Sequence, residues 1–191
     1  MGMKAWFVVL AHSAPADVLR RPRIDIAATD ALVDDLFGRR RFRRPGDLFT
    51  DADPRDGHIA AGVFHDVAIV AYEGFVTEPT KIPPGLIAAA RGGTVDQFAL
   101  HSVSALGIYG HWDGGNLVRA IAGADGEVQE DVGEPLTFER AEHGEDQVDP
   151  DFLDLEYIVE EALASRLGFR FEGAVVPNGP EPREIPLRVY R

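Results

Sequence analysis

An arginine followed by a dense acidic segment is the part of this chain whose residue types and spacing could do chemistry. Arg119 lies in a stretch that predicts antiparallel strands, and the acidic segment Glu130–Glu139 follows it closely. A guanidinium binds a carboxylate or a phosphate through two parallel hydrogen bonds. On an apolar sheet face, however, a guanidinium must be paired if it is buried. The pattern predicts a structural ion pair, and the alternative is a site for a small anion.

Three acidic side chains surround Gly133, namely Glu130, Asp131 and Glu134. Neighbouring carboxylates can separate their pKa values for acid–base work, or bind a divalent cation. The pair Glu134-Pro135 is also an ordinary lead-in to a helix that starts at Pro135. The structural interpretation is therefore favoured for this cluster as well.

The histidines carry no recognised metal motif such as HExxH. His101 and His111 lie on neighbouring predicted strands, and they could meet if the connection between those strands is short. His101 and Ser102 cannot act as base and nucleophile, because adjacent residues on a strand point to opposite faces. The chain contains no cysteine, which excludes thiolate metal sites and a cysteine nucleophile. We expect no cofactor and no tightly bound zinc or iron.

Two further patterns are weaker. The run Arg39–Arg44 could bind phosphate or an acidic partner, but charge runs are usually solvated faces. It more often balances local acids such as Asp34 and Asp35, or the acid-rich loop Glu142–Asp154. The stretch Asp51–Gly57 imitates a calcium loop but lacks the final glutamate, so it predicts a polar turn.

Size and charge limit the class of protein. A chain of 191 residues with 45% hydrophobic residues suits one domain with its own core. The net charge of −13 argues against nucleic-acid binding and anionic membranes, because the summed field repels polyanions. No apolar run approaches the roughly 20 residues of a membrane span. The apolar run Ala5–Ala11 is at the minimum length for a signal core, and the preferred interpretation is a buried first strand over Lys4–Leu10, so we expect a cytoplasmic protein.

The Gly114-Gly115 pair gives the clearest local signal, a two-residue hairpin turn. This turn predicts that Trp112 lies opposite Leu117, with Ile108 opposite Ile121 on the core-facing side. In that register Arg119 faces Gly110 and shares a face with Trp112. Other strands are expected over 4–11, 58–64, 67–72, 94–102 and 105–112, and helices over 15–21, 26–37, 83–90 and from Asp149 to Leu167.

Strands occur in adjacent pairs and do not alternate with helices. This order predicts an α+β fold, a mainly antiparallel sheet with helices packed on one side, in a single domain over residues 1–173. Arg39–Phe49 is expected to be extended or irregular. The Pro-rich C-terminal tail, residues 174–191, is expected not to form a central strand or helix.

The chain also resembles a known group of proteins. The resemblance is carried by Lys4-Ala5-Trp6, Gly62-Val63-Phe64, His101-Ser102, the hairpin from Trp112 to Arg119, and above all by Glu130-Asp131-Val132-Gly133-Glu134-Pro135-Leu136 with Phe138 and Glu139. These residues are similar to an uncharacterised actinobacterial family, a domain of unknown function of about 200 residues. The resemblance covers most of the chain up to Gly173. It implies a bacterial cytosolic origin and no known activity.

Two functional classes follow. The first is a soluble cytosolic binding or interaction module that recognises a small anion or a protein partner. The second is a small hydrolase or transferase that uses the acidic cluster with His101 or His111, with or without a divalent metal. The candidate site residues are Arg119, Glu130, Asp131, Glu134, His101, His111 and Trp112. The surroundings of Arg119 distinguish a structural role from a functional one. If protein carboxylates bind its whole guanidinium away from solvent, the role of Arg119 is structural.

Overall fold

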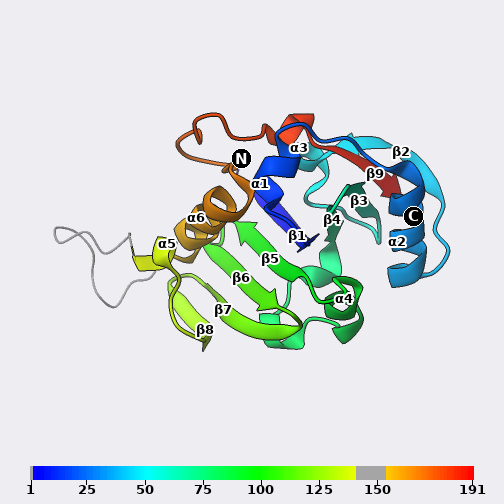
Figure 1. The fold of residues 1–191 in the computed structure, drawn as a ribbon. Coiled ribbons are helices and arrows are strands. Elements are labelled where there is room, and N and C mark those ends of the chain that lie inside the picture. Colours follow the sequence, from blue (N-terminus) through cyan, green and yellow to red (C-terminus); the bar gives the residue numbers. More distant parts are fainter. Residues whose placement is uncertain (1, 141–153) are drawn as a thin grey trace.

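The structure is a computed structural model that describes residues 2–140 and 154–191 (Figure 1). Its framework is one nine-stranded sheet in the order β2-β9-β3-β4-β1-β5-β6-β7-β8, and every pairing between described strands is antiparallel. The predicted α+β class and antiparallel sheet are confirmed. No helix in the described part of the chain is both long and apolar enough to cross a bilayer.

The elements have the following bounds. The strands are β1 (Lys4–Ala11), β2 (Phe42–Asp47), β3 (Ile59–Phe64), β4 (Val67–Tyr72), β5 (Thr94–His101), β6 (Leu106–Asp113), β7 (Asn116–Ala124), β8 (Glu127–Val132) and β9 (Pro186–Tyr190). The helices are α1 (Pro15–Leu19), α2 (Ile26–Phe37), α3 (Leu48–Asp51), α4 (Pro84–Ala89), α5 (Thr137–Arg140) and α6 (Leu155–Leu167), with 3-10 turns η1 (Glu73–Phe75), η2 (Pro79–Lys81) and η3 (Pro182–Glu184).

Helix ends follow local sequence chemistry. The side chain of Asp25 caps α2 by accepting the amide of Ala28 at 3.0 Å. Asp154 caps α6 in the same way, and Gly168 ends it in a left-handed conformation. The cap predicted at Asp149 lies outside the described residues, and the observed helix begins at Leu155.

Helices cover both faces of the sheet, which corrects the expectation of one covered side. One core contains Phe7 and Val9 of β1 with residues of α1, α3 and α6. The other contains Val8 and Leu10 of the same strand with residues of α2 and α4. Neighbouring residues of β1 are thus buried on opposite faces, as expected for a central strand with apolar residues on both sides. Figure 1 shows α6 against strands β5–β7, away from α2 and α4.

The C-terminal residues form an internal strand, so the expectation that the Pro-rich tail contributes no central strand was wrong. Strand β9 lies between β2 and β3 and pairs with both. Its only proline, Pro186, is the first residue, where a missing amide is tolerated. Residues 39–49 were expected to be extended or irregular, and their central part is extended, because β2 pairs along β9 as an edge strand.

The β6–β7 hairpin has the predicted turn and a register that the sequence did not reveal. Trp112 lies opposite Leu117 as predicted. The register then shifts, so that Arg119 lies opposite His111 and not Gly110, and Ile121 lies opposite Tyr109 and not Ile108. This shift is a β-bulge, in which one extra residue changes the face that the following side chains occupy. Arg119 consequently lies on the face away from Trp112.

Candidate functional site

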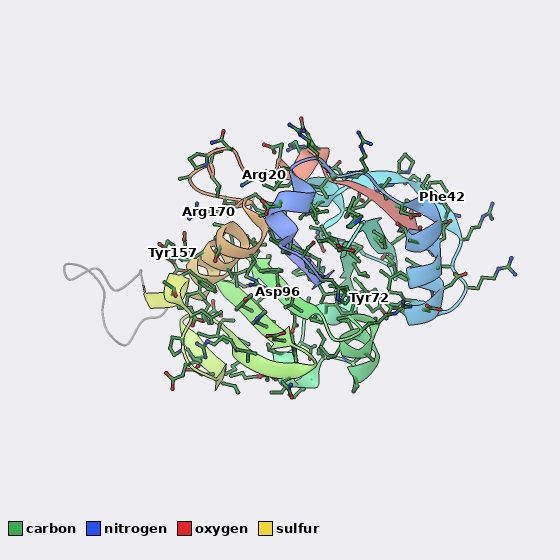
Figure 2. The ribbon with its side chains drawn as sticks, in the orientation of Figure 1. Arg20, Phe42, Tyr72, Asp96, Tyr157 and Arg170 are labelled. Atoms are coloured by element: carbon green, nitrogen blue, oxygen red, sulfur yellow. The ribbon has the colours of Figure 1, made fainter. Side chains whose placement is uncertain are left out.

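A row of polar side chains crosses the sheet beneath α5 and α6. Asp96 of β5 pairs with His111 of β6, and His111 pairs with Arg119 of β7. Cross-strand partners have side chains on the same face of a sheet, so these three residues are neighbours. Figure 2 shows Asp96 among the strands in the middle of the molecule. Two members of this polar row, His111 and Arg119, are among the site residues predicted from the sequence.

Every nitrogen of the Arg119 guanidinium donates a hydrogen bond. Nε and Nη2 donate to the carboxylate of Glu139 in α5, at 2.9 and 2.6 Å. Nη1 donates to Asp131 of β8 and to the carbonyls of Val132 and Gly133, at 3.0 and 3.2 Å for the carbonyls. Burial by itself lowers the pKa of Arg119. The hydrogen bonds to Glu139 and Asp131 have a larger effect in the opposite direction, so the pKa is raised above its usual value.

Arg119 is therefore a structural anchor. It is 1% exposed and paired with the acidic segment, as the sequence predicted, although on the other face of the sheet. Its bidentate contact with Glu139 ties α5 to β7, while Asp131 and the carbonyls tie β8 to the same point. With each nitrogen bonded to the protein and the side chain buried, this guanidinium is not accessible to a small anion. The structure therefore does not support the alternative interpretation of Arg119 as a site for a small anion.

Asp96 is the second centre of the polar row and is fully buried. It accepts hydrogen bonds from the hydroxyl of Tyr109 at 3.0 Å, from Nδ1 of His111 at 2.8 Å, and from Nη2 of Arg166 in α6 at 3.0 Å. Burial, with the nearby charge of Asp96, raises the pKa of Tyr109 well above its usual value. Since a carboxylate only accepts, Nδ1 of His111 carries the proton.

The remaining predicted residues do not assemble into one site. Glu130 accepts from the amide and hydroxyl of Thr80, both at 3.2 Å. Glu134 is exposed and makes no hydrogen bond or ion pair with any residue in 2–140 or 154–191. Glu130 and Asp131 are adjacent on β8 and bond to partners on opposite sides of it. In the same two ranges, no three acidic or histidine side chains are grouped closely enough to hold a metal ion.

Neither His101 nor Trp112 is part of the polar row, and Trp112, which follows His111 on β6, lies on the opposite face of the sheet. Nδ1 of His101 is 2.6 Å from the hydroxyl of Ser104, and His101 pairs with Leu106, so it does not meet His111. Its Nε2 and the indole nitrogen of Trp6 are both buried without a hydrogen-bond partner in the described residues. Trp112 lines an apolar groove with Leu117 and residues of η2 and α4.

The arginine run is divided between local partners. Arg44 forms an ion pair with Asp51 in α3, and the amide of Arg40 bonds to Asp34. Arg188 of β9 lies 3.9 Å over the ring of Phe42. These contacts agree with the expectation that local acids balance part of the run. The other suggested partner, the loop after Glu142, lies outside the described residues.

An acidic cleft of about 520 Å³ flanks α6, near the labelled Tyr157 and Arg170 in Figure 2. Its buried member, Glu160, accepts the amides of Phe171 and Glu172, at 2.9 and 3.1 Å. Burial raises the pKa of Glu160 to about 7, and the charge of Glu172 contributes to this rise. Arg170 pairs with Glu161 at 2.6 Å. The groups of this cleft mainly hold the chain after α6 against the helix.

A different cleft, between α2 and α4, has the composition of a ligand site. Its volume is about 310 Å³. Apolar side chains from five segments line it: Leu10, Ala28, Ala31, Leu32, Val63, Val67, Ala68, Ala89 and Ala90. The contribution of α2 has helical spacing, since positions 28, 31, 32 and 35 form one stripe. Small alanine side chains on both helices leave the space between them unfilled.

Polar groups gather at the rim of this cleft, which we call the α2–α4 cleft. They are His12, Asp35, His65, Asp66 and Arg91. His65 and Arg91 have left-handed backbone conformations, with φ of 53° and 48°. Local turn geometry accounts for both, because His65 is in the two-residue turn between β3 and β4 and Arg91 follows the C-cap of α4. At the same rim, a Cβ on Gly93 would lie 2.3 Å from the carbonyl oxygen of Ala11 and 2.9 Å from the ring of His12, so glycine allows the close approach of these two backbone segments.

Sequence reasoning missed both Asp96 and the α2–α4 cleft. Asp96 had a signal, because it is an acidic residue inside the otherwise apolar strand Thr94–His101. The cleft had none, because its rim residues come from β1, α2, the β3–β4 turn and the turn after α4, and each looks like an ordinary surface residue alone.

Comparison with known proteins places the chain in a family. The model of a family of unknown function, DUF6928, matches residues 5–190. The chain belongs to DUF6928. The match to DUF6928 extends past Gly173 and so includes β9, the strand that the sequence analysis had assigned to the tail. No curated protein and no solved structure matches the chain. The polar row and the α2–α4 cleft both lie within the DUF6928 region.

Proposed function

We propose that this protein binds a small molecule in the α2–α4 cleft. The observation that carries the proposal is the combination of an apolar floor with a rim of charged and imidazole side chains in one cavity. Ligand sites of soluble proteins typically have this composition, and 310 Å³ is at the lower end of their usual size. Because the guanidinium of Arg119 is already bound by protein carboxylates, we place the binding site in this cleft and not at Arg119.

The compartment is part of the same proposal. We infer a cytosolic protein of actinobacterial origin. Supporting this are the absence of cysteine, which fits a reducing compartment, and the ratio of 17 arginines to 2 lysines, which is typical of a GC-rich genome.

A pair of variants on one helix tests the site. Ala31→Phe places a large ring in the cleft, whereas Ala27→Phe places the same ring on the exposed surface of α2 outside it. Ligand-observed NMR with a set of small apolar acids, amines and amino acids would identify a binder to the wild type. We expect Ala31→Phe to abolish binding and Ala27→Phe to retain it, with both variants folded. Equal binding by both variants, or no binder in the whole set, would contradict the proposal.

A second candidate function rests on the Asp96–His111 contact. Asp96 fixes the proton of His111 on Nδ1, and Nε2 has no hydrogen-bond partner in the described residues. An imidazole held in this way can act as a general base toward an attacking water. The test is hydrolysis of p-nitrophenyl esters and phosphates by the wild type and by His111→Asn. Loss of a measurable rate in the variant would favour a hydrolase, and an unchanged rate would exclude His111 as the base.

A further inference from the structure

We infer that the ligand of the α2–α4 cleft is a small zwitterion with an apolar side chain, of the size and chemistry of a branched α-amino acid. This inference rests on the proposed function, because it names the ligand class of the same cleft. The argument uses the charges of the rim, the apolar floor and the size of the cavity.

The rim presents charges of both signs that are free to act on a ligand. Arg91 follows α4, and Asp35 lies on the cleft-facing stripe of α2. Within residues 2–140 and 154–191, neither side chain forms a hydrogen bond or an ion pair, and the same holds for the imidazole of His12. All three residues are exposed, so a ligand at the rim can reach their side chains from solvent. The cleft therefore collects one free guanidinium, one free carboxylate and one free imidazole.

The charge balance disfavours a simple anion. Two carboxylates, Asp35 and Asp66, line the same rim, and in the described part of the chain Asp66 is paired only with the imidazole of His65, at 2.9 Å. The protein as a whole carries a net charge of −13, which repels anions. A simple cation would instead leave the guanidinium of Arg91 unused. A zwitterion satisfies both signs, because its carboxylate can bind Arg91 and its ammonium group can bind Asp35.

The apolar floor of the α2–α4 cleft is the reason for the apolar side chain of the inferred ligand. Leu10 and Ala68 of the sheet and Leu32 of α2 form an apolar base below the charged rim. At about 310 Å³ the space suits a ligand of few heavy atoms. A branched aliphatic side chain can lie on this floor while its charged groups stay at the rim, in contact with solvent.

Three probes of nearly the same shape test the inference. L-Leucine carries both charges, 3-methylbutylamine lacks the carboxylate, and 4-methylpentanoate lacks the amino group. Titration calorimetry or ligand-observed NMR should show that L-leucine binds most tightly. Arg91→Gln should weaken L-leucine and 4-methylpentanoate by about tenfold or more and leave 3-methylbutylamine unchanged. Asp35→Asn should weaken L-leucine and 3-methylbutylamine and leave 4-methylpentanoate unchanged. Asp34→Asn, the neighbouring acid outside the cleft, is the matched control and should alter none of them.

The outcomes separate this inference from the proposed function. Equal binding of L-leucine and 4-methylpentanoate, with no effect of Asp35→Asn, would overturn the zwitterion while the cleft remains the site. Binding of L-leucine that neither Arg91→Gln nor Asp35→Asn weakens would also overturn it. If no probe binds the wild type, the zwitterion is refuted. The proposed function is refuted only by a further result. That result is that no compound of the wider set of acids and amines binds the wild type, or that Ala31→Phe does not abolish the binding of any compound that does.

Discussion

Replacing Arg119 by alanine should destabilise the fold severely. The variant leaves the carboxylate of Glu139, which is 6% exposed, without the guanidinium that binds both of its oxygens. Among the residues that the structure describes, only the amide of Leu136 still donates to that carboxylate, at 3.0 Å. Removing one partner of a buried ion pair costs about 3–5 kcal/mol, because it strands the other charge away from water. For a chain of this size, each kcal/mol lowers Tm by roughly 2–4 °C, so the loss should be about 6–20 °C.

The assay is thermal and urea unfolding of four proteins at pH 7. They are the wild type, Arg119→Ala, Asp131→Asn and the double variant Arg119→Met with Glu139→Leu. Asp131 is 60% exposed at its side chain, so Asp131→Asn should cost less than about 1 kcal/mol. The double variant should recover much of the stability lost in Arg119→Ala, because no buried charge remains unpaired.

A melting curve of Arg119→Ala that matches the wild type would refute this reasoning. It would mean that the guanidinium stabilises nothing in the free protein and is available for a ligand. A double variant no more stable than Arg119→Ala would show instead that lost packing, and not the stranded carboxylate, causes the destabilisation.

Three further predictions concern other parts of the fold. Burial and neighbouring charge raise the pKa of Glu160 above its unfolded value, so its contribution to stability is present at low pH and is lost as pH rises through about 7. Glu172→Gln should lower the pKa of Glu160 and therefore raise Tm at pH 8, with a gain in stability of about 1.4 kcal/mol per pKa unit. At pH 4 the variant and the wild type should have the same Tm. Equal melting curves of the two proteins at both pH values would contradict the prediction. Gly133→Ala should destabilise strongly, since its Cβ would lie 2.1 Å from the carbonyl oxygen of Val118; urea unfolding measures this, and a neutral result would show that the backbone can move apart. Asp96→Asn should lower Tm by several degrees, because it weakens the bonds that hold α6 to the sheet, and a Tm equal to that of the wild type would contradict this role.

The sequence was most informative where local chemistry decides the structure. The Gly114-Gly115 pair adopts positive φ at both residues, as the predicted turn requires, and it aligns Trp112 with Leu117. The caps of α2 and the end of α6 at Gly168 follow from single residues in the same way. The ion pair of Arg119 was predictable because a guanidinium in a sheet near acidic residues must find partners.

Other features depend on contacts that no local pattern records. The extra residue of the β-bulge after Leu117 moves Arg119 to the opposite face, and nothing in the apolar pattern marks its position. Strand β9 was missed because the prolines before it dominate the composition, although its last five residues contain only Pro186 at the start. The α2–α4 cleft joins segments that lie far apart in the chain, so only the three-dimensional arrangement brings Asp35 and Arg91 together.

The absence of cysteine allows a direct measurement of the central claim, that the α2–α4 cleft is the ligand site. An Ala31→Cys variant places a single thiol in the cleft, and an Ala27→Cys variant places one outside it on the same helix. The measurement is the rate of alkylation of each thiol by iodoacetamide, with and without saturating L-leucine or another binder from the probe set. We predict that the binder slows alkylation at position 31 and leaves the rate at position 27 unchanged. Equal rates with and without the bound molecule at position 31 would show that the ligand lies elsewhere.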